Sequence, residues 1–366
     1  MKKILVLLFV ILLAGCSGSS DLYLSRFTYD EYLNTVTDIK VYHNKKHDTD
    51  SKLYKAVDEL LENTHGIFDA HSTSSELGIL NETAHNEPVE VSDELYSVIK
   101  EALHYAEISD GAYDPTIGPL ADLWGIDESS WLTGGVVPSD ASIQNTLEDV
   151  DYTKVTLNES NQTVFFEKED IKLDLGGIAK GYITELLKDL LIDKGIDHAV
   201  ISVGSSSQLT IGTRVTQSGF DSSNEAIYID EETPWRIGTR DPFDTIGFGG
   251  AIAAYTILDE AVSTSGSSIQ FFEVDGVRYH HIFDTKTGYP VDNNLIAIQL
   301  KSDNIVGIDA VSTMLYVMGL EDGMEYVESN EGLEAIFITY DKEVYISSGF
   351  DGFELFDDEY EMKTMK

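Results

Sequence analysis

The sequence has one cysteine, Cys16, in 366 residues. A lone thiol cannot close an intrachain disulfide, and it cannot build a zinc site from several thiolates. The sequence also lacks the residue spacing of a Ser/His/Asp triad or of zinc ligands. The folded part must therefore be stabilised by apolar burial, and a hydrophobic content of 42% is sufficient for one or two full cores.

Positive charge is scarce as well. The chain has 24 lysines and arginines against 65 aspartates and glutamates, a formal net charge of −41. Nucleic acids and anionic lipid surfaces are polyanions, so neither is expected as the main partner. An anionic substrate would need a local cation such as Lys180, or a bound metal, to be held in this field.

The apolar run at the N-terminus is short. Residues 4–13 are almost purely apolar, whereas a membrane-spanning helix needs about 20 such residues. This length is typical of a cleaved export signal. The run ends in Leu13-Ala14-Gly15-Cys16, which resembles a bacterial lipobox, although Cys16 could instead be a free structural thiol. We expect a lipoprotein signal peptide at 1–15, a lipidated tether at 16–30 and a domain at 31–366, anchored on the extracytoplasmic face of the cell membrane.

Hydrophobic periodicity predicts strands and helices in mixed order. Hairpins together with separate helices favour an α+β fold over a doubly wound sheet. Two acidic stretches, 127–151 and 217–232, are interpreted as surface insertions. The expected helices are 51–68, one capped by Ser92, one from 179 and 303–319, and the expected strands are 33–42, 164–166, 171–173, 199–203, 209–211, 235–238, 269–274, 277–283, 335–339 and 344–347.

The stretch 173–182 combines a strand, a glycine turn and the start of a helix at Ala179-Lys180. Glycines let the backbone approach a ligand closely, and the free N–H groups of a helix start favour an anion such as phosphate. The spacing is neither the dinucleotide fingerprint nor the P-loop, so a purely structural turn is the alternative.

Asp309 lies in a helix that is otherwise apolar nearly all round, with Thr313 one turn further on. Such a helix is buried, and a buried carboxylate needs a partner. A carboxylate and a hydroxyl at this spacing share a face and offer hard oxygen ligands to Mg²⁺. The alternatives are that Asp309 caps a later helix or only bonds Thr313.

Asp275-Gly276 is a strong hairpin signal. On a strand continuing to Phe283, His281 points with the aromatic residues and His280 points away. Histidine is a common general base toward an alcohol, but adjacent histidines on a strand are also often structural.

Six motifs in order resemble the FAD:protein FMN transferases of the ApbE family, over about residues 33–319. They are Ser75-Glu76-Leu77 with Leu80-Asn81, Gly111-Ala112-Tyr113-Asp114-Pro115, Asp174 to Tyr182, Val262-Ser263-Thr264-Ser265-Gly266, His280 to Asp284 with Thr287-Gly288-Tyr289-Pro290, and Asp309-Ala310-Val311-Ser312-Thr313.

This resemblance implies a T-fold-like α+β architecture of mixed antiparallel sheets with packed helices. It implies Mg²⁺-dependent transfer of FMN from FAD, the substrate, to a Thr or Ser hydroxyl of an acceptor flavoprotein, with release of AMP. Known acceptors of the family include membrane-bound respiratory subunits. The implied metal ligands are Asp309, Thr313 and the main-chain carbonyl of Ala179, with His281 as base and His280 as its alternative. The implied FAD pocket comprises Leu33, His71, Ala112, Tyr113, Asp114, Gly176, Lys180, Tyr182 and Phe283.

The chain departs from the family pattern at three places. His71 stands where a tyrosine is usual, Thr285 replaces a proline, and Ser202-Val203-Gly204-Ser205 replaces an Asn-x-Gly-Gly strand end. The competing functions are an FAD pyrophosphatase, with water in place of the acceptor, and a non-catalytic flavin-binding lipoprotein.

Overall fold

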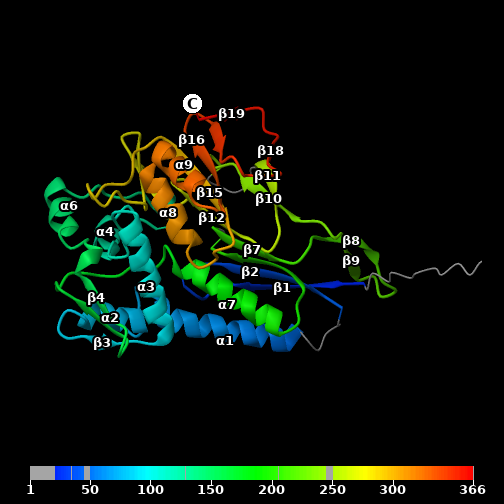
Figure 1. Ribbon diagram of the computed structural model, residues 1–366, viewed down its shortest axis with the longest axis horizontal. Coiled ribbons are helices and arrows are strands. Elements are labelled where there is room, and N and C mark those ends of the chain that lie inside the picture. Colours follow the sequence, from blue (N-terminus) through cyan, green and yellow to red (C-terminus); the bar gives the residue numbers. More distant parts are fainter. Residues whose placement is uncertain are drawn as a thin grey trace, which may run out of the picture.

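The computed structural model describes residues 21–365 except 34, 45–49, 128, 205 and 245–249. The predicted signal peptide and Cys16 lie outside the described residues. Within them, a nine-stranded sheet forms the centre, in the order β1-β2-β6-β7-β12-β15-β16-β17-β19 (Figure 1). Neighbours are antiparallel except β17 and β19. The strands are Tyr23–Tyr29, Thr37–His43, His198–Val203, Ser207–Ile211, Ala261–Gly266, Leu295–Ser302, Leu333–Thr339, Glu343–Ile346 and Glu361–Lys363.

Helices cover one face of this sheet. α7 (Ala179–Asp193) packs on β6 and β7, and α8 (Ile308–Met318) packs on β12 and β15 (Figure 1). α1 (Asp50–Phe68) lies against α7, α3 (Asp93–Ile108) against α8, and α9 (Leu320–Ser329) on β16. None of the helices among the described residues is both long and apolar enough to cross a membrane.

A second apolar core lies on the other face of the sheet. Along β16, Ala335 and Phe337 belong to the core under the helices, whereas Ile336 and Ile338 belong to the second core. Because both faces are covered, this strand is apolar throughout rather than alternating. The second core is completed by a small sheet of β10 (Trp235–Arg240), β11 (Ala251–Ile257) and β18 (Glu354–Leu355).

Smaller elements flank the central sheet. Residues 127–151 include α5 (Ser130–Thr133) and α6 (Asp140–Leu147), and residues 217–232 lie in the hairpin of β8 (Val215–Phe220) and β9 (Ala226–Asp230). β13 (Phe271–Val274) and β14 (Val277–His280) form the predicted hairpin. The remaining elements are α2 (Glu76–Thr83), α4 (Gly118–Trp124), the 3₁₀ turn Tyr152–Lys154, β3 (Val89–Glu90), β4 (Val155–Asn158) and β5 (Thr163–Phe166).

The α+β class is therefore confirmed, and most predicted elements are present. One predicted strand is absent and several elements are shorter than predicted: the strand expected at 33–42 begins at Thr37, and the one expected at 269–274 begins at Phe271. Residues 171–173 form only a single β-bridge, between Lys172 and Ile117, and not a strand. The side chain of Asn81 bonds both the N–H and the C=O of Leu173, so these groups are not available for a ladder. The helix predicted from 303 begins at Ile308, after a turn in which the N–H of Gly307 donates to Asn304. The second hairpin strand ends at His280 and does not reach Phe283.

Candidate functional site

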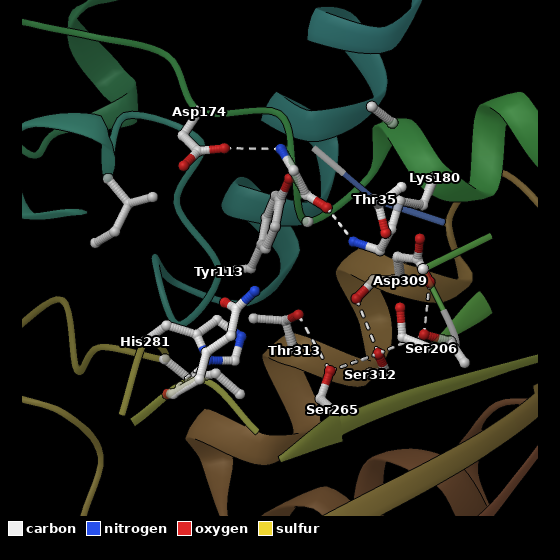
Figure 2. A pocket seen from close by; sticks show the side chains of 18 of the residues that line it. Thr35, Tyr113, Asp174, Lys180, Ser206, Ser265, His281, Asp309, Ser312 and Thr313 are labelled. Atoms are coloured by element: carbon white, nitrogen blue, oxygen red, sulfur yellow. Dashed lines mark hydrogen bonds between the residues drawn. The ribbon is translucent and has the colours of Figure 1, made fainter. Parts of the chain in front are cut away.

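A cavity of about 460 Å³ opens at the start of α7 (Figure 2). Every predicted site residue within the described chain lines it, with the exception of Tyr182, whose ring packs edge-on against Phe68 and so lies behind the wall. The predicted residues that line the cavity are Leu33, His71, Ala112, Tyr113, Asp114, Gly176, Ala179, Lys180, His281, Phe283, Asp309 and Thr313.

The glycine turn before α7 is held by its own side chains. Asp174 accepts the N–H of Gly176 at 2.8 Å, and the Lys180 ammonium donates to the Gly176 carbonyl (Figure 2). A Cβ at Gly181 would lie 2.5 Å from the carbonyl oxygen of Ile305 and 2.6 Å from that of Val306. Only glycine therefore lets α7 approach the segment leading into α8, and this contact brings the two helix starts together.

Asp309 is 3% exposed, in the first turn of α8, and is surrounded by hydroxyl groups. Ser207 donates to its two carboxylate oxygens, and Ser263 donates to Oδ1. Hydrogen bonds between hydroxyl groups then lead from Ser263 to Ser312, from Ser312 to Ser265 and from Ser265 to Thr313. Figure 2 shows the last two of these bonds. The partners of Asp309 are thus serines of the sheet, and the helix does not begin after it.

No lysine or arginine in the described part of the chain forms an ion pair with Asp309. Asp309 is thus satisfied by neutral hydroxyl donors, and no cationic side chain of the described residues is paired with it beside the cavity. The described residues contain no cluster of three or more His, Cys, Asp or Glu side chains that could hold a metal. A metal beside Asp309 would therefore also need hydroxyl, carbonyl, water or phosphate oxygens as ligands.

The two histidines have different environments. His280 is 3% exposed, with Nε2 on the carbonyl of Val291 and Nδ1 accepting the N–H of Ile282. Burial lowers its pKa to about 4. His281 lines the cavity instead, and its Nδ1 is 3.4 Å from the Gln270 carbonyl oxygen (Figure 2). The pKa of His281 is also lowered, first by loss of hydration of its ring and then by the charge of the neighbouring His280.

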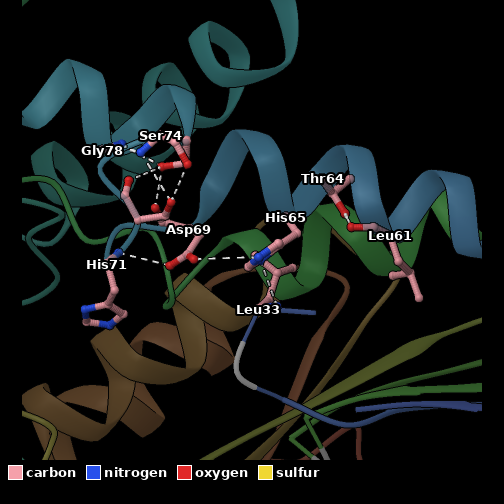
Figure 3. A network of polar contacts seen from close by, with 10 residues as sticks. Leu33, Leu61, Thr64, His65, Asp69, His71, Ser74 and Gly78 are labelled. Carbon is pink, nitrogen blue, oxygen red and sulfur yellow. Dashed lines mark hydrogen bonds and ion pairs between the residues drawn. The ribbon is translucent and has the colours of Figure 1, made fainter. Parts of the chain in front are cut away.

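One rim of the cavity depends on a polar network around Asp69 (Figure 3). The carboxylate accepts the N–H of His71 at 3.0 Å and lies 3.8 Å from the ring of His65. His65 in turn accepts the N–H of Leu33, a residue with a positive φ of 55°. Two predicted pocket residues distant in the chain, Leu33 and His71, are therefore held by one carboxylate–imidazole pair.

The opposite wall contains the Ala112-Tyr113-Asp114 loop. Asp114 accepts bonds from the N–H and hydroxyl of Thr116 and from the N–H of Tyr152, so this carboxylate fixes the loop. Burial raises its pKa. The Tyr113 hydroxyl is buried and has no hydrogen-bond partner in the described part of the chain, and burial raises its pKa well above the usual value. The Thr285 hydroxyl, in the segment after the β13–β14 hairpin, donates a hydrogen bond to the Gly111 carbonyl at 2.6 Å and so connects that segment to this loop.

Several lining residues escaped the sequence interpretation. Thr35 and Ser206 line the cavity close to Lys180 and Asp309 (Figure 2), and Ser207 lies behind Asp309. Serines are common and no spacing marks them, so the only available signal was the unusual run Ser205 to Ser207 at the strand end.

Comparison with known proteins agrees with this arrangement. The family model described as "ApbE family" matches residues 33–337. An FAD:protein FMN transferase of Klebsiella pneumoniae is 30% identical over 83% of this chain and 87% of its own length, and one of Treponema pallidum is 29% identical over 87% and 85%.

Solved structures show the same fold. The ApbE protein of Thermotoga maritima superposes with a TM-score of 0.74 at 30% identity, covering 90% of this chain and 98% of its own. The flavin transferase ApbE from Vibrio cholerae gives 0.73 at 26% identity with the same coverage. The chain belongs to the ApbE family and is an FAD:protein FMN transferase.

Proposed function

We propose that this transferase moves the FMN half of FAD to a Ser or Thr hydroxyl of an acceptor protein in a Mg²⁺-dependent reaction that releases AMP. One observation carries the proposal: the start of α7 and the Asp309–Thr313 pair line one hydroxyl-rich cavity. A helix start that favours anions, beside a buried carboxylate with no cationic partner among the described residues, suits a metal-bound diphosphate.

The residues present fit Mg²⁺. It prefers octahedral oxygen coordination and is usually bound by one or two carboxylates plus substrate phosphates. Asp309, the Thr313 hydroxyl and the Ala179 carbonyl are the groups that would hold it. When bound, the metal would neutralise charge on the diphosphate and help to orient it. The remaining ligands are expected to be phosphate and water oxygens.

FAD binding is proposed along the cavity. The N–H groups at the start of α7 and the Lys180 ammonium would receive the diphosphate, because both favour an anion. Lys180 already lies next to this turn, bonded to the Gly176 carbonyl, and needs only to change partner. The ring systems and sugars would contact the flanking walls at Leu33, His71, Ala112, Tyr113, Asp114 and Phe283.

His281 is proposed as the general base. A carbonyl only accepts hydrogen bonds, so a bond between Nδ1 and Gln270 puts the proton on Nδ1 and leaves Nε2 free to accept. Its lowered pKa keeps the ring neutral near pH 7. The acceptor oxygen forms a bond to the FMN phosphorus, the bond from that phosphorus to the bridging oxygen breaks, AMP leaves with that oxygen, and Nε2 takes the hydroxyl proton.

The test combines the purified protein, FAD, Mg²⁺ and candidate acceptor flavoproteins. Flavin fluorescence that stays on the acceptor after denaturing electrophoresis, with one AMP released per label, is the expected result. AMP release that needs no acceptor would instead assign FAD pyrophosphatase activity. Absence of both in the presence of Mg²⁺ would contradict the proposal.

Two variants separate the roles. Asp309→Ala should abolish labelling, because the only carboxylate of the proposed metal site is removed, and wild-type labelling would refute that assignment. His281→Ala should slow transfer by about 10²–10⁴-fold, as for loss of a general base, while FAD still binds. If His280→Ala slows transfer with FAD binding unchanged and His281→Ala does not, the base is the other histidine.

We also propose that the protein is a lipoprotein, attached through Cys16 to the extracytoplasmic face of the cell membrane. The sequence Leu13-Ala14-Gly15-Cys16 after a short apolar run supports this. Two acyl chains on that thiol would give stable anchoring. The acceptor would then be a membrane-associated redox subunit on the same side. Labelling of cells with a palmitate analogue should mark the wild type and leave Cys16→Ser unlabelled, and equal labelling would contradict the anchor.

A further inference from the structure

The two oxygens of the Asp309 carboxylate are not equally engaged. Ser207 Oγ lies 2.8 Å from Oδ1 and 2.9 Å from Oδ2, whereas Ser263 Oγ lies 2.6 Å from Oδ1 alone. Both serines are almost fully buried, at 1% and 2% exposure. A hydroxyl has one proton to donate. Among the described residues, Oδ1 therefore accepts from two donors and Oδ2 shares the single proton of Ser207 at most. Oδ2 therefore keeps the greater free acceptor capacity.

We infer that Ser207 and Ser263 are positioning residues, which orient the Asp309 carboxylate so that Oδ2 is the oxygen offered to the divalent cation. This inference rests on the metal site proposed above. Ser207 does not line the cavity, so it acts from behind the carboxylate and not as a ligand. Mutation of groups that hold a metal ligand in this way typically lowers metal affinity by about 10–100-fold.

The two serines are placed by the register of the central sheet. Ser207, the first residue of β7, pairs directly with Ser263 of β12. Directly opposite residues of neighbouring antiparallel strands point to the same face of a sheet, here the face on which α8 lies. The donors thus come from rigid strands, which hold a site more precisely than loops do.

Neutral donors suit this position better than charged ones. A lysine or arginine beside Asp309 would satisfy the buried carboxylate by an ion pair and would compete with an incoming cation. Serine hydroxyls satisfy it by hydrogen bonds without forming an ion pair. The further contacts from Ser263 through Ser312 and Ser265 to Thr313 link the same donors to the second proposed ligand.

The test measures metal binding directly, without turnover. The full-length protein is titrated with Mn²⁺, and free Mn²⁺ is followed by electron paramagnetic resonance. Ser207→Ala should weaken binding about 10–100-fold relative to wild type, in the range found for outer groups of metal sites. Ser267→Ala is the matched control: that serine is also fully buried and hydrogen-bonded, to Tyr340 and the Ile296 carbonyl, but does not contact Asp309, and its Mn²⁺ affinity should not change.

Each outcome is decisive. Wild-type or tighter Mn²⁺ binding by Ser207→Ala overturns the inference and leaves the metal site standing. No Mn²⁺ binding by the wild type overturns the metal site and the inference with it. Equal weakening in Ser267→Ala would show a general effect of removing a buried hydroxyl and would also overturn it. If Ser207→Ala does not fold, Ser263→Ala takes its place under the same criteria.

A kinetic readout adds a second check. In Ser207→Ala the Mg²⁺ concentration for half-maximal FMN transfer should rise by the same factor as the Mn²⁺ dissociation constant, while kcat at saturating Mg²⁺ stays near that of the wild type. A fall in kcat that saturating Mg²⁺ does not restore would contradict a role in holding the metal ligand.

Discussion

Replacing Gly181 by alanine should separate the two helix starts on which the site depends. The new Cβ would lie 2.5 Å from one main-chain oxygen, of Ile305, and 2.6 Å from the next, of Val306. Carbon–oxygen contacts normally begin near about 3.3 Å, so α7 and this segment must move apart by about 0.8 Å. Ala179 is two residues before Gly181, and Asp309 is three residues after Val306, so the shift falls on the proposed metal ligands.

The stability effect should be small and the catalytic effect large. Alanine is favoured over glycine in a helix by about 1 kcal/mol, while overpacking costs about 1–3 kcal/mol, so the net loss of unfolding free energy is about 0–2 kcal/mol. Misplacement of a reacting group by about 1 Å can lower the rate about 100-fold, equivalent to about 2.7 kcal/mol of activation free energy.

The assay compares kcat/KM for FMN transfer with the free energy of unfolding in urea. Gly66→Ala is the control, because Gly66 lies in α1 and its added Cβ would meet nothing within 4 Å. That variant should gain about 1 kcal/mol of stability and keep full activity. Activity of Gly181→Ala within threefold of wild type, with its fold intact, would refute the argument that this helix contact sets the site geometry.

Two further predictions concern buried polar groups near the cavity. Tyr113→Phe removes a buried hydroxyl that has no partner among the described residues, so the free energy of unfolding of the FAD-free protein should rise by about 1 kcal/mol or more in urea titrations. A decrease would show that the hydroxyl is satisfied. His280 has a pKa of about 4 in the folded protein and of about 6.5 in the unfolded chain. Between these two pH values the unfolded chain binds more protons than the folded protein. The free energy of unfolding therefore falls as the pH is lowered from about 6.5 to about 4, by up to about 3 kcal/mol. Unfolding free energies at pH 6.5 and 4.5, compared with those of His280→Gln, check this, and an equal pH dependence in the variant would contradict it.

Elements with strong local signals were predictable. α1 and α3 show the expected apolar stripes, and Ser92 caps α3 by accepting the N–H of Leu95, as a serine at that position should. The Asp275-Gly276 turn joins β13 and β14. The strand predicted at 171–173 was wrong, because apolar composition cannot reveal that the side chain of the distant Asn81 bonds the main chain of Leu173.

The histidine prediction shows a similar limit. The strand expected to carry both histidines ends at His280, so strand alternation does not place His281. The sequence also did not say which histidine faces a cleft. The strand ends at His280, whose ring nitrogens bond the main chain at Val291 and Ile282, and this leaves His281 at the cavity. That outcome depends on packing against residues distant in the chain.

The sequence by itself determined the fold class, the family, the helix starting at Ala179 and the pairing of Asp309 with Thr313 on one helical face, because each follows from local periodicity or from motifs in order. Only the tertiary structure decided that Ser207 and Ser263 meet Asp309, that Tyr182 lies behind Phe68, and that α7 and α8 start side by side. The serine contacts depend on sheet register, and the adjacent helix starts depend on the close approach at Gly181. Each of these contacts joins chain segments that are far apart in the sequence; the smallest separation, between Ser263 and Asp309, is 46 residues. Local patterns carry no information about such pairings.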